Sequence, residues 1–207
     1  MINDGLQKYG WSEAAPKVSH DYIFPKVLEL MPANMPLRIL DAGCGNGYMA
    51  NELAKLGHEV VGIDIAEDGI SIAKKQYPNV KFYARSLYEN ITDIIADVDL
   101  IVSTEVIEHL YSPKTYLQNL HTVLRPSGSI ILTTPYHGYL KNLALSITNS
   151  WDKHHTVDWE GGHIKFFSEK TLSKMIHEAD FVNIQFNNAG RINWLWKSMV
   201  CRAEKNA

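Results

Sequence analysis

A glycine-rich turn that follows an apolar run constrains the fold of this chain most. The apolar run covers residues 37–41, and the turn from Asp41 to Gly47 reads Asp-Ala-Gly-Cys-Gly-Asn-Gly. Apolar residues then recur at helical spacing from Met49 to Leu56. Between a buried strand and a helix, such a turn leaves backbone amides free, and glycines let a ligand approach them closely. The sequence therefore predicts an open α/β sheet with a ligand site at the end of its first strand.

Apolar runs and amphipathic stretches continue to alternate along the chain. Six further runs have the length and composition of strands, and they lie at residues 59–64, 80–84, 99–104, 129–134, 181–186 and 194–201. The last two are joined by Asn187 to Gly190, which favours antiparallel pairing. We therefore predict an α/β fold with a Rossmann-like, doubly wound sheet of seven strands, mostly parallel with an antiparallel C-terminal edge strand.

The length of 207 residues, with 45% hydrophobic and 21% charged residues, suits one globular domain over residues 1–207. Residues 1–36 contain four prolines and predict an N-terminal helical appendage folded over the sheet edge. Periodicity fades at residues 135–167, where two tryptophans and four histidines gather, so we expect a substrate lid there. Ser112 and Ser168 stand where two later helices should begin.

Charge and cysteine content exclude several classes of protein. The net charge of -3 provides no basic field, so we expect no nucleic-acid partner. Cys44 and Cys201 do not indicate an oxidising compartment. The sequence shows neither a signal-peptide pattern nor an apolar stretch long enough to cross a bilayer, so we expect a cytoplasmic protein. A peripheral membrane contact and a monomeric or homodimeric state both stay open.

An acidic residue stands where a nucleoside ligand would need it. Asp64 ends the second apolar run, 21 positions after Gly43, and an acid there in an open α/β sheet reaches ribose hydroxyls. A dinucleotide-binding fingerprint would need glycine at the position of Tyr48, and no lysine follows the glycines as in a phosphate-binding P-loop. These departures argue against an oxidoreductase that uses a dinucleotide.

The turn, Asp64 and residues 99–109 together resemble the successive motifs of class I methyltransferases, which use S-adenosylmethionine (SAM). The resemblance covers about residues 37–134. It implies that Asp41 and the glycine turn hold the methionine end of SAM and that Asp64 takes the ribose hydroxyls. Ser86 stands where most members carry an aspartate near adenine. The implied cofactor-binding residues are Asp41, Gly43, Cys44, Gly45, Asn46, Gly47, Asp64, Ile65, Ser86, Leu87 and Glu105.

Glu105, Glu108 and His109 resemble the metal-associated motif of the ubiquinone-pathway O-methyltransferases. That resemblance implies a Mg²⁺-like ion that would orient an oxygen-bearing acceptor, although histidine is an atypical ligand for magnesium. The same Glu-His-Leu sequence occurs in class I methyltransferases without a metal, where Glu108 and His109 shape the floor of a loop. Both interpretations stay open at this point.

Two histidines are candidate catalytic bases, because an imidazole can accept a hydroxyl proton near neutral pH. They are His109 and His137, and His137 closely follows the fifth strand-like run. His163 precedes the helix start at Ser168 and has a structural interpretation. Further lid residues that could contact a substrate are His154, His155 and Asp158, and an aromatic wall could form from Tyr9, Trp11, Tyr136, Tyr139, Trp151 and Trp159.

The function that these features favour is transfer of a methyl group from SAM to an oxygen atom of a small-molecule acceptor. Two alternatives remain. One is methylation of nitrogen or carbon, and the other is a non-catalytic SAM-binding module, which the missing adenine aspartate would support.

Overall fold

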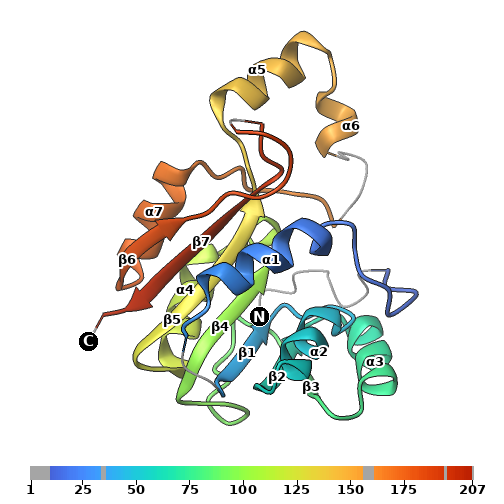
Figure 1. Cartoon of the computed structure of the whole chain (residues 1–207), viewed down its shortest axis with the longest axis vertical. Coiled ribbons are helices and arrows are strands. Elements are labelled where there is room, and N and C mark those ends of the chain that lie inside the picture. The colour runs from blue at the N-terminus through green and yellow to red at the C-terminus, as the bar shows by residue number, and fades with distance from the viewer. Residues whose placement is uncertain (1–9, 34–35, 156–160, 194, 207) are drawn as a thin grey trace.

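The computed structural model describes residues 10–33, 36–155, 161–193 and 195–206. Figure 1 shows a central twisted sheet with helices on both sides. The strands are β1 (Arg38–Ala42), β2 (Glu59–Asp64), β3 (Lys81–Ala84), β4 (Val98–Thr104), β5 (Leu124–Pro135), β6 (Phe181–Phe186) and β7 (Ser198–Lys205). The helices are α1 (His20–Leu30), α2 (Tyr48–Lys55), α3 (Glu67–Gln76), the short 3₁₀ helix η1 (Ile107–His109), α4 (Pro113–Val123), α5 (Tyr139–Ile147), α6 (Trp151–His155) and α7 (Glu169–Glu178).

The sheet has seven strands in the order β3-β2-β1-β4-β5-β7-β6. The first five strands pair in parallel, whereas β7 pairs antiparallel with both β5 and β6. The predicted fold class is therefore confirmed. The antiparallel strand is β7, which lies one position in from the edge, and β6 forms the edge itself.

Two helical layers cover the two faces of this sheet, because successive residues of a strand point to opposite sides. On β4, Ile101 packs into the cluster that includes α4 and α7, and its neighbour Val102 packs into the cluster that includes α1, α2 and α3. Both clusters are formed mainly by fully buried aliphatic side chains. The strands in the middle of the sheet are thus covered twice, as their continuous apolar runs predict.

Strand β7 begins later than predicted. The expected strand covered residues 194–201, but pairing with β5 extends from Ser198 to Glu204. Trp196 precedes the strand and packs edge to face on Tyr136 at 5.2 Å between ring centroids. Charged side chains such as Glu204 interrupt the apolar pattern of the second half of β7, which explains the shift.

The sequence suggested that the N-terminal helical appendage folds over the sheet edge. Helix α1 instead lies on a face of the sheet. Its Ile23 and Val27 are fully buried in the same cluster as Ile131 of β5 and Val200 of β7. The helix therefore spans the junction of these two strands, in front of the sheet in Figure 1. This position brings residues 10–19, which precede the helix, to the carboxyl ends of β1 and β2.

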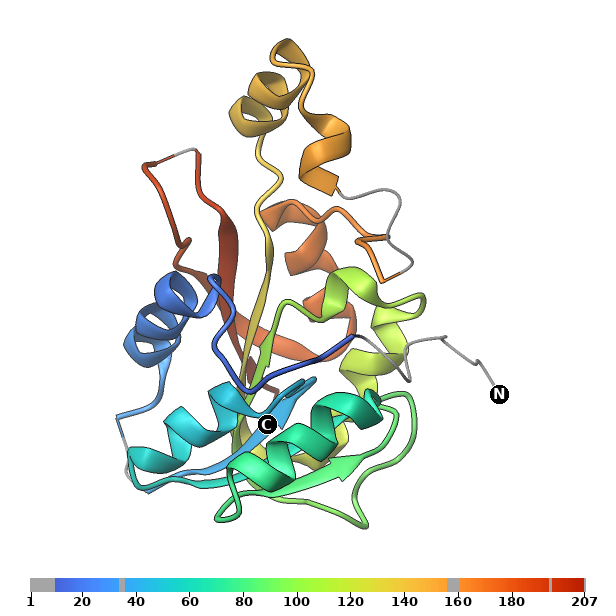
Figure 2. The ribbon, with the colours of Figure 1, turned by 90° about the vertical axis from the view of Figure 1, so that its right-hand side faces the viewer.

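The predicted lid contains two helices where the sequence had suggested a loop. Helices α5 and α6 form a hairpin that stands away from the sheet, at the top of Figures 1 and 2. The indole N–H of Trp151 donates to Ser146 Oγ at 2.9 Å and closes the hairpin. Leu140, Leu143 and Ile147 do recur at helical spacing, but all three are exposed.

The two predicted helix starts differ in their chemistry. Ser168 accepts the N–H of Thr171 and forms a capping box at the start of α7, as expected. Ser112 stands at the predicted start of α4, but its side chain makes no capping bond, and Pro113 opens the helix. In the part of the chain that is described, no helix is both long and apolar enough to cross a bilayer.

Candidate active site

The turn after β1 has a backbone that requires glycine. Gly43 and Gly45 have φ angles of +83° and +51°, in the left-handed region that residues with a Cβ rarely adopt. A Cβ at Gly43 would lie 2.3 Å from the Val106 side chain, and one at Gly45 would lie 2.3 Å from the Trp11 ring. The turn therefore keeps its backbone close to the space in front of it.

Asp64 ends β2 and is fixed by this turn. Its Oδ2 accepts the Gly45 N–H at 2.8 Å, and its Oδ1 accepts the Ala66 N–H at 2.8 Å. Burial raises the pKa of the Asp64 carboxyl, and these backbone hydrogen bonds oppose the rise. Each oxygen keeps further acceptor capacity, so the carboxylate can also bind hydroxyl groups of a ligand.

A cavity of about 260 Å³ opens in front of the turn, and we call it the glycine-loop cavity. Of the predicted cofactor-binding residues, it is lined by Gly43, Cys44, Gly45, Asn46, Asp64, Ile65, Ser86, Leu87 and Glu105. The other lining residues that matter below are Trp11, Lys17, His20, His109 and His163. The structure thus brings one continuous set of predicted residues around a single space.

Asp41 and Gly47 do not line this cavity. Asp41 is fully buried beneath the turn, and neither of its carboxylate oxygens accepts a hydrogen bond. Burial raises the pKa of the Asp41 carboxyl to about 7, and nearby Asp64 adds to the rise. Gly47 packs against Ala73 and Phe82 on the side of α3 and β3. A direct contact of these two residues with a cofactor stays a prediction.

Residues 10–15 lie across the turn and are bound to it. The N–H groups of Gly10 and Trp11 both donate to Asp68 Oδ2, at 2.9 and 3.0 Å. The side-chain amide of Asn46 donates to the carbonyl groups of Glu13 and Ala15, at 3.0 and 2.9 Å. We call this segment the N-terminal strap. It places the Trp11 ring against Gly45, where the ring lines the glycine-loop cavity.

Glu105 follows β4 in a strained conformation. Its φ is +54°, which is uncommon for a residue with a side chain and is typical of functional sites. Its N–H donates to Thr133 Oγ1 at 3.0 Å, and that hydroxyl donates to Glu105 Oε1 at 2.9 Å. Burial raises the pKa of the Glu105 carboxyl to about 7.

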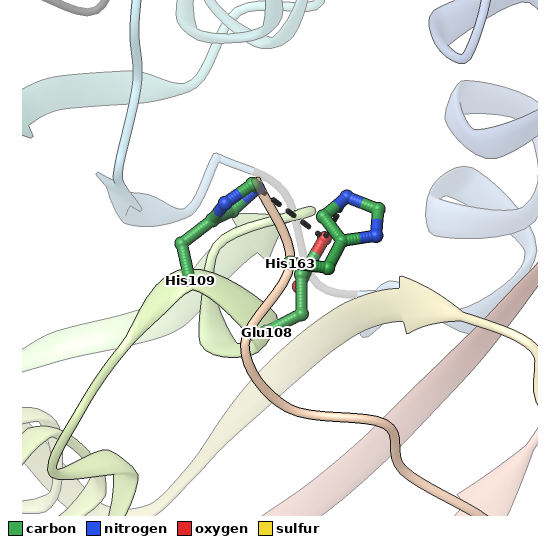
Figure 3. A group of neighbouring side chains, drawn as sticks. All are labelled: Glu108, His109 and His163. Carbon is green, nitrogen blue, oxygen red and sulfur yellow. Dashed lines mark ion pairs between the residues drawn. The ribbon is translucent and has the colours of Figure 1, made fainter. Parts of the chain in front are cut away.

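Glu108, His109 and His163 form a cluster next to this position (Figure 3). Glu108 Oε1 lies 3.8 Å from His109 Nε2 and 4.0 Å from His163 Nε2. One ligand atom from each residue lies within 4.8 Å of the others, which is compatible with binding one metal ion. Glu105, for which the resemblance implied a metal site with Glu108 and His109, is not part of this cluster among the described residues, and its carboxylate accepts a hydrogen bond from Thr133. His163 takes its place.

The cluster is electrostatically unsatisfied. Burial raises the pKa of the Glu108 carboxyl well above its ordinary value, and it lowers the pKa of His109 and brings that of His163 to about 4. Burial thus favours the uncharged form of each group. Neither oxygen of the buried Glu108 carboxylate accepts a hydrogen bond. A divalent cation would stabilise the charged carboxylate, and two imidazoles with one carboxylate suit a first-row transition metal better than Mg²⁺.

A second cavity, of about 250 Å³, lies beside the first. We call it the cationic cavity, and it is lined by Tyr22, Glu105, Pro135, Lys141, His154, His163, Arg191, Lys197 and Ser198. Glu105 and His163 line both cavities, so the two spaces adjoin at these residues. Sequence reasoning missed Lys141, Arg191 and Lys197 because they come from separate segments with no common motif.

Other predicted lid residues lie away from both cavities. His137 stacks on His155 with 5.5 Å between ring centroids and contacts Phe166, and burial lowers its pKa to about 4. Of the aromatic residues predicted as a wall, Trp11 lines the glycine-loop cavity, whereas Tyr136, Tyr139 and Trp151 line neither cavity. Tyr9, Asp158 and Trp159 lie outside the described residues.

A family model described as a methyltransferase domain matches residues 17–186, most of the chain. The chain belongs to this methyltransferase domain family. The resemblance that the motifs carry is therefore confirmed, and the match includes the glycine turn, Asp64 and the Glu108 cluster.

Curated relatives point to the predicted subgroup. The chain is 30% identical over 172 residues to the ubiquinone biosynthesis O-methyltransferase of Ruegeria pomeroyi, covering 77% of this chain and 66% of that protein. It is 30% identical over 179 residues to the human mitochondrial ubiquinone biosynthesis O-methyltransferase, covering 79% of this chain and 48% of that protein. The chain thus spans about half to two thirds of the length of these relatives.

Solved structures share the fold at low sequence identity. Magnesium protoporphyrin IX methyltransferase from Synechocystis superposes with a TM-score of 0.70 at 18% identity, over 99% of this chain and 94% of that one. The [4+2]-cyclase SpnF also superposes with a TM-score of 0.70, at 14% identity, over 89% of this chain and 80% of that one. Because a cyclase has the same fold, function must be argued from the site.

Proposed function

We propose that this chain binds SAM in the glycine-loop cavity and transfers its methyl group to an oxygen atom of a small organic acceptor in the cationic cavity. The observation that carries the proposal is that Glu105 and His163 line both cavities. A methyl donor on one side of these residues and an acceptor on the other would meet at them. The curated relatives, which are named O-methyltransferases, support oxygen as the accepting atom.

The glycine-loop cavity fits the parts of SAM. There is no room for a Cβ at Gly43 or Gly45, so the turn carries no side chain at these two positions. The methionine end of SAM would therefore face backbone amide groups. Asp64 would accept the ribose hydroxyls with the acceptor capacity that its two backbone bonds leave. Ser86 and Leu87 line the same cavity and would contact the adenine.

SAM supplies an electrophilic methyl carbon on a sulfonium whose positive charge disappears as the methyl group moves. With SAM bound, the accepting oxygen would bond to that carbon as the carbon–sulfur bond breaks, which would leave a neutral thioether and release the hydroxyl proton. The chain holds the oxygen in line and excludes water. The hydroxyl proton must go to a base, and His163 is placed for this because its imidazole lies at the junction and burial keeps it neutral.

His109 supports this arrangement from η1. Its Nδ1 lies 3.2 Å from the Gly162 carbonyl oxygen, which places the proton on Nδ1 and turns Nε2 toward Glu108. Glu108, His109 and His163 would hold a divalent ion, which would act as a Lewis acid on the acceptor oxygen. With such an ion bound, His163 would be its ligand and not the base. His137 remains a prediction as a base, although its ring lines neither cavity.

The test is a pair of measurements on the wild-type chain. Isothermal titration with SAM and with NAD measures cofactor choice, and a screen with methyl-labelled SAM against phenols, organic acids and amines measures transfer. We expect SAM binding without NAD binding, and label on a hydroxyl oxygen. Label found mainly on amines would replace O-methylation by N-methylation. SAM binding with no transfer to any acceptor would instead indicate a non-catalytic binding module.

A further inference from the structure

Three cationic side chains converge on the cationic cavity. Lys141 comes from α5, and Arg191 and Lys197 come from the connection between β6 and β7. Building on the proposed function, we propose that this cavity binds an anionic oxygen group of the methyl acceptor, a carboxylate or a phosphate monoester. The acceptor class is then a hydroxyl-bearing organic anion, with its anionic group toward these cations and its hydroxyl toward Glu105 and His163.

Lys141 is the strongest evidence for an anionic ligand. It is only 6% exposed, and it is the single buried residue of α5. Its Nζ donates to one acceptor, the Lys197 carbonyl oxygen, at 3.5 Å. An ammonium group has three donors, so Lys141 keeps donors for a ligand in the cavity that it lines. Burying a lysine in this way is unfavourable unless its charge is compensated.

Arg191 and Lys197 extend the positive wall. Arg191 sits in a left-handed conformation with φ of +56°, just after Gly190, and its guanidinium can bind two oxygens of a carboxylate or phosphate at once. Lys197 Nζ lies 4.8 Å from the centre of the Tyr22 ring, which holds this lysine at the wall. Among the described residues, no carboxylate lies within ion-pair distance of any of these three cations.

The groups that face these cations do not neutralise them. Glu105 is the one carboxylate among the lining residues, and burial raises its pKa to about 7, so it carries only part of a charge at neutral pH. Burial keeps His154 uncharged, with a pKa of about 4. The pKa of Lys141 is lowered to about 8 by burial and by Arg191, and the lysine is still mostly charged at pH 7. The cavity therefore carries an excess of positive charge.

The two ends of the cationic cavity differ in charge, and this difference sets the orientation of the acceptor. Glu105 and His163 adjoin the glycine-loop cavity, whereas Lys141, Arg191 and Lys197 line only the second cavity. An acceptor whose anionic group binds the cations would thus present its other end to the methyl donor. An uncharged acceptor of the same shape would gain nothing from the cations and would leave them uncompensated.

The experiment compares three hydroxyl-bearing aromatic probes whose second substituent is a carboxylate, an uncharged ester or a phosphate monoester: 3-hydroxybenzoate, its methyl ester, and 3-hydroxyphenyl phosphate. Binding is measured by calorimetry with and without SAM, and KM is measured with labelled SAM. We expect the wild type to bind at least one of the two anions at least 10-fold more tightly than the ester. The preferred anion identifies the group as carboxylate or phosphate. Equal binding of all three probes, or binding of none, overturns the proposal.

Variants of the cationic residues distinguish a role in anion binding from a role in folding. Arg191→Gln and Lys141→Met should each raise KM for the preferred anion about 10-fold or more, with little change for the ester and none in SAM affinity. Lys170→Met replaces an exposed lysine of α7 that lines neither cavity, and it should change nothing.

Loss of affinity for ester and anion alike would contradict the proposal. Because Arg191 is exposed, its variant remains informative if Lys141→Met fails to fold. If the anions bind but SAM does not, the proposed function is rejected, whereas the anion-binding role of the cationic cavity still holds.

Discussion

The hydroxyl of Thr133 holds both the backbone and the carboxylate of Glu105. It accepts the Glu105 N–H at 3.0 Å and donates to Glu105 Oε1 at 2.9 Å. Strands β4 and β5 are neighbours, so this pair fixes a strained residue at the junction of the two cavities from the adjacent strand. Glu105 can keep its left-handed backbone because a partner on a rigid element fixes it.

Thr133→Val should release Glu105. We expect a loss of about 1–3 kcal/mol in unfolding free energy, since a buried hydrogen bond to a carboxylate is removed. We also expect a fall in kcat with SAM affinity nearly unchanged, because Glu105 is placed at the junction. Thr133→Ser keeps the hydroxyl and should recover most of both losses. If valine and serine behave alike in denaturation and turnover, the hydroxyl has no such role.

Asp64→Ala should weaken SAM binding by roughly 1–3 kcal/mol, because a charged acceptor for the ribose hydroxyls is lost. Calorimetry measures this directly. Glu59→Ala is the matched control, since Glu59 begins the same strand at its other end and is exposed. An Asp64 variant that binds SAM as tightly as the Glu59 variant would remove this carboxylate from the cofactor site.

Asp68→Ala should detach the N-terminal strap, because Asp68 accepts the N–H groups of both Gly10 and Trp11. We expect SAM affinity to fall about 10-fold, as Trp11 no longer covers the turn, with little change in the melting temperature. Tryptophan fluorescence and calorimetry provide the two readouts. Glu67→Ala, at an exposed neighbouring position, should leave both unchanged. Unaltered SAM affinity in the Asp68 variant would show that the strap does not contribute to binding.

Asp41 should make the stability of the chain depend on pH. The pKa of its carboxyl is raised to about 7 by burial, whereas an unfolded aspartate titrates near 3.9. Between about pH 4 and pH 7 the Asp41 carboxyl is therefore protonated in the folded state and ionised in the unfolded state. The free energy of unfolding that this group contributes is lost as the pH rises through this range. Asp41→Asn should therefore gain stability relative to wild type as pH rises, as measured by urea unfolding from pH 4 to 8. Asp97→Asn makes the same chemical change at an exposed position and is the matched control. A constant difference for Asp41→Asn would contradict the raised pKa.

The Glu108 cluster should prefer Mn²⁺ or Zn²⁺ over Mg²⁺, because it offers two imidazole nitrogens and one carboxylate. We expect the transition ions to raise the melting temperature of the wild type and Mg²⁺ to have little effect. His163→Gln should abolish the shift, whereas His177→Gln, on the exposed side of α7, should not. A response to Mg²⁺ alone, or a shift that survives in His163→Gln, would reject this donor set.

The lining of the glycine-loop cavity could be predicted from sequence because its signals are contiguous. The glycine turn directly follows β1, and Asp64 ends β2, so strand position alone brings them to one edge of the sheet. His163 could not be assigned in this way, since it lies 54 positions after His109 and reaches the cluster only through the loop that leads to α7.

The lining of the cationic cavity was harder to predict because helix α5, which contributes Lys141, does not follow the hydrophobic pattern. In α5 the apolar residues Leu140 and Leu143 are exposed, whereas Lys141 is buried. A reading by hydrophobic periodicity would turn this helix the other way and place the lysine in solvent. Charged residues that face a ligand cavity leave no periodic signal of their own, so only the folded arrangement identifies them.

The position of β7 between β5 and β6 also bears on how the chain is assembled during synthesis. Residues 181–186 leave the ribosome before residues 198–205, yet β6 pairs only with β7 in the described sheet. Until Met199, Val200 and Cys201 are made, one edge of β5 and the whole of β6 lack the strand with which they pair. A nascent chain can mispair at the open edge of β5 during this time. Arg191 and Lys197 lie between these two strands, so the cationic cavity is complete only once β7 has paired with both neighbours.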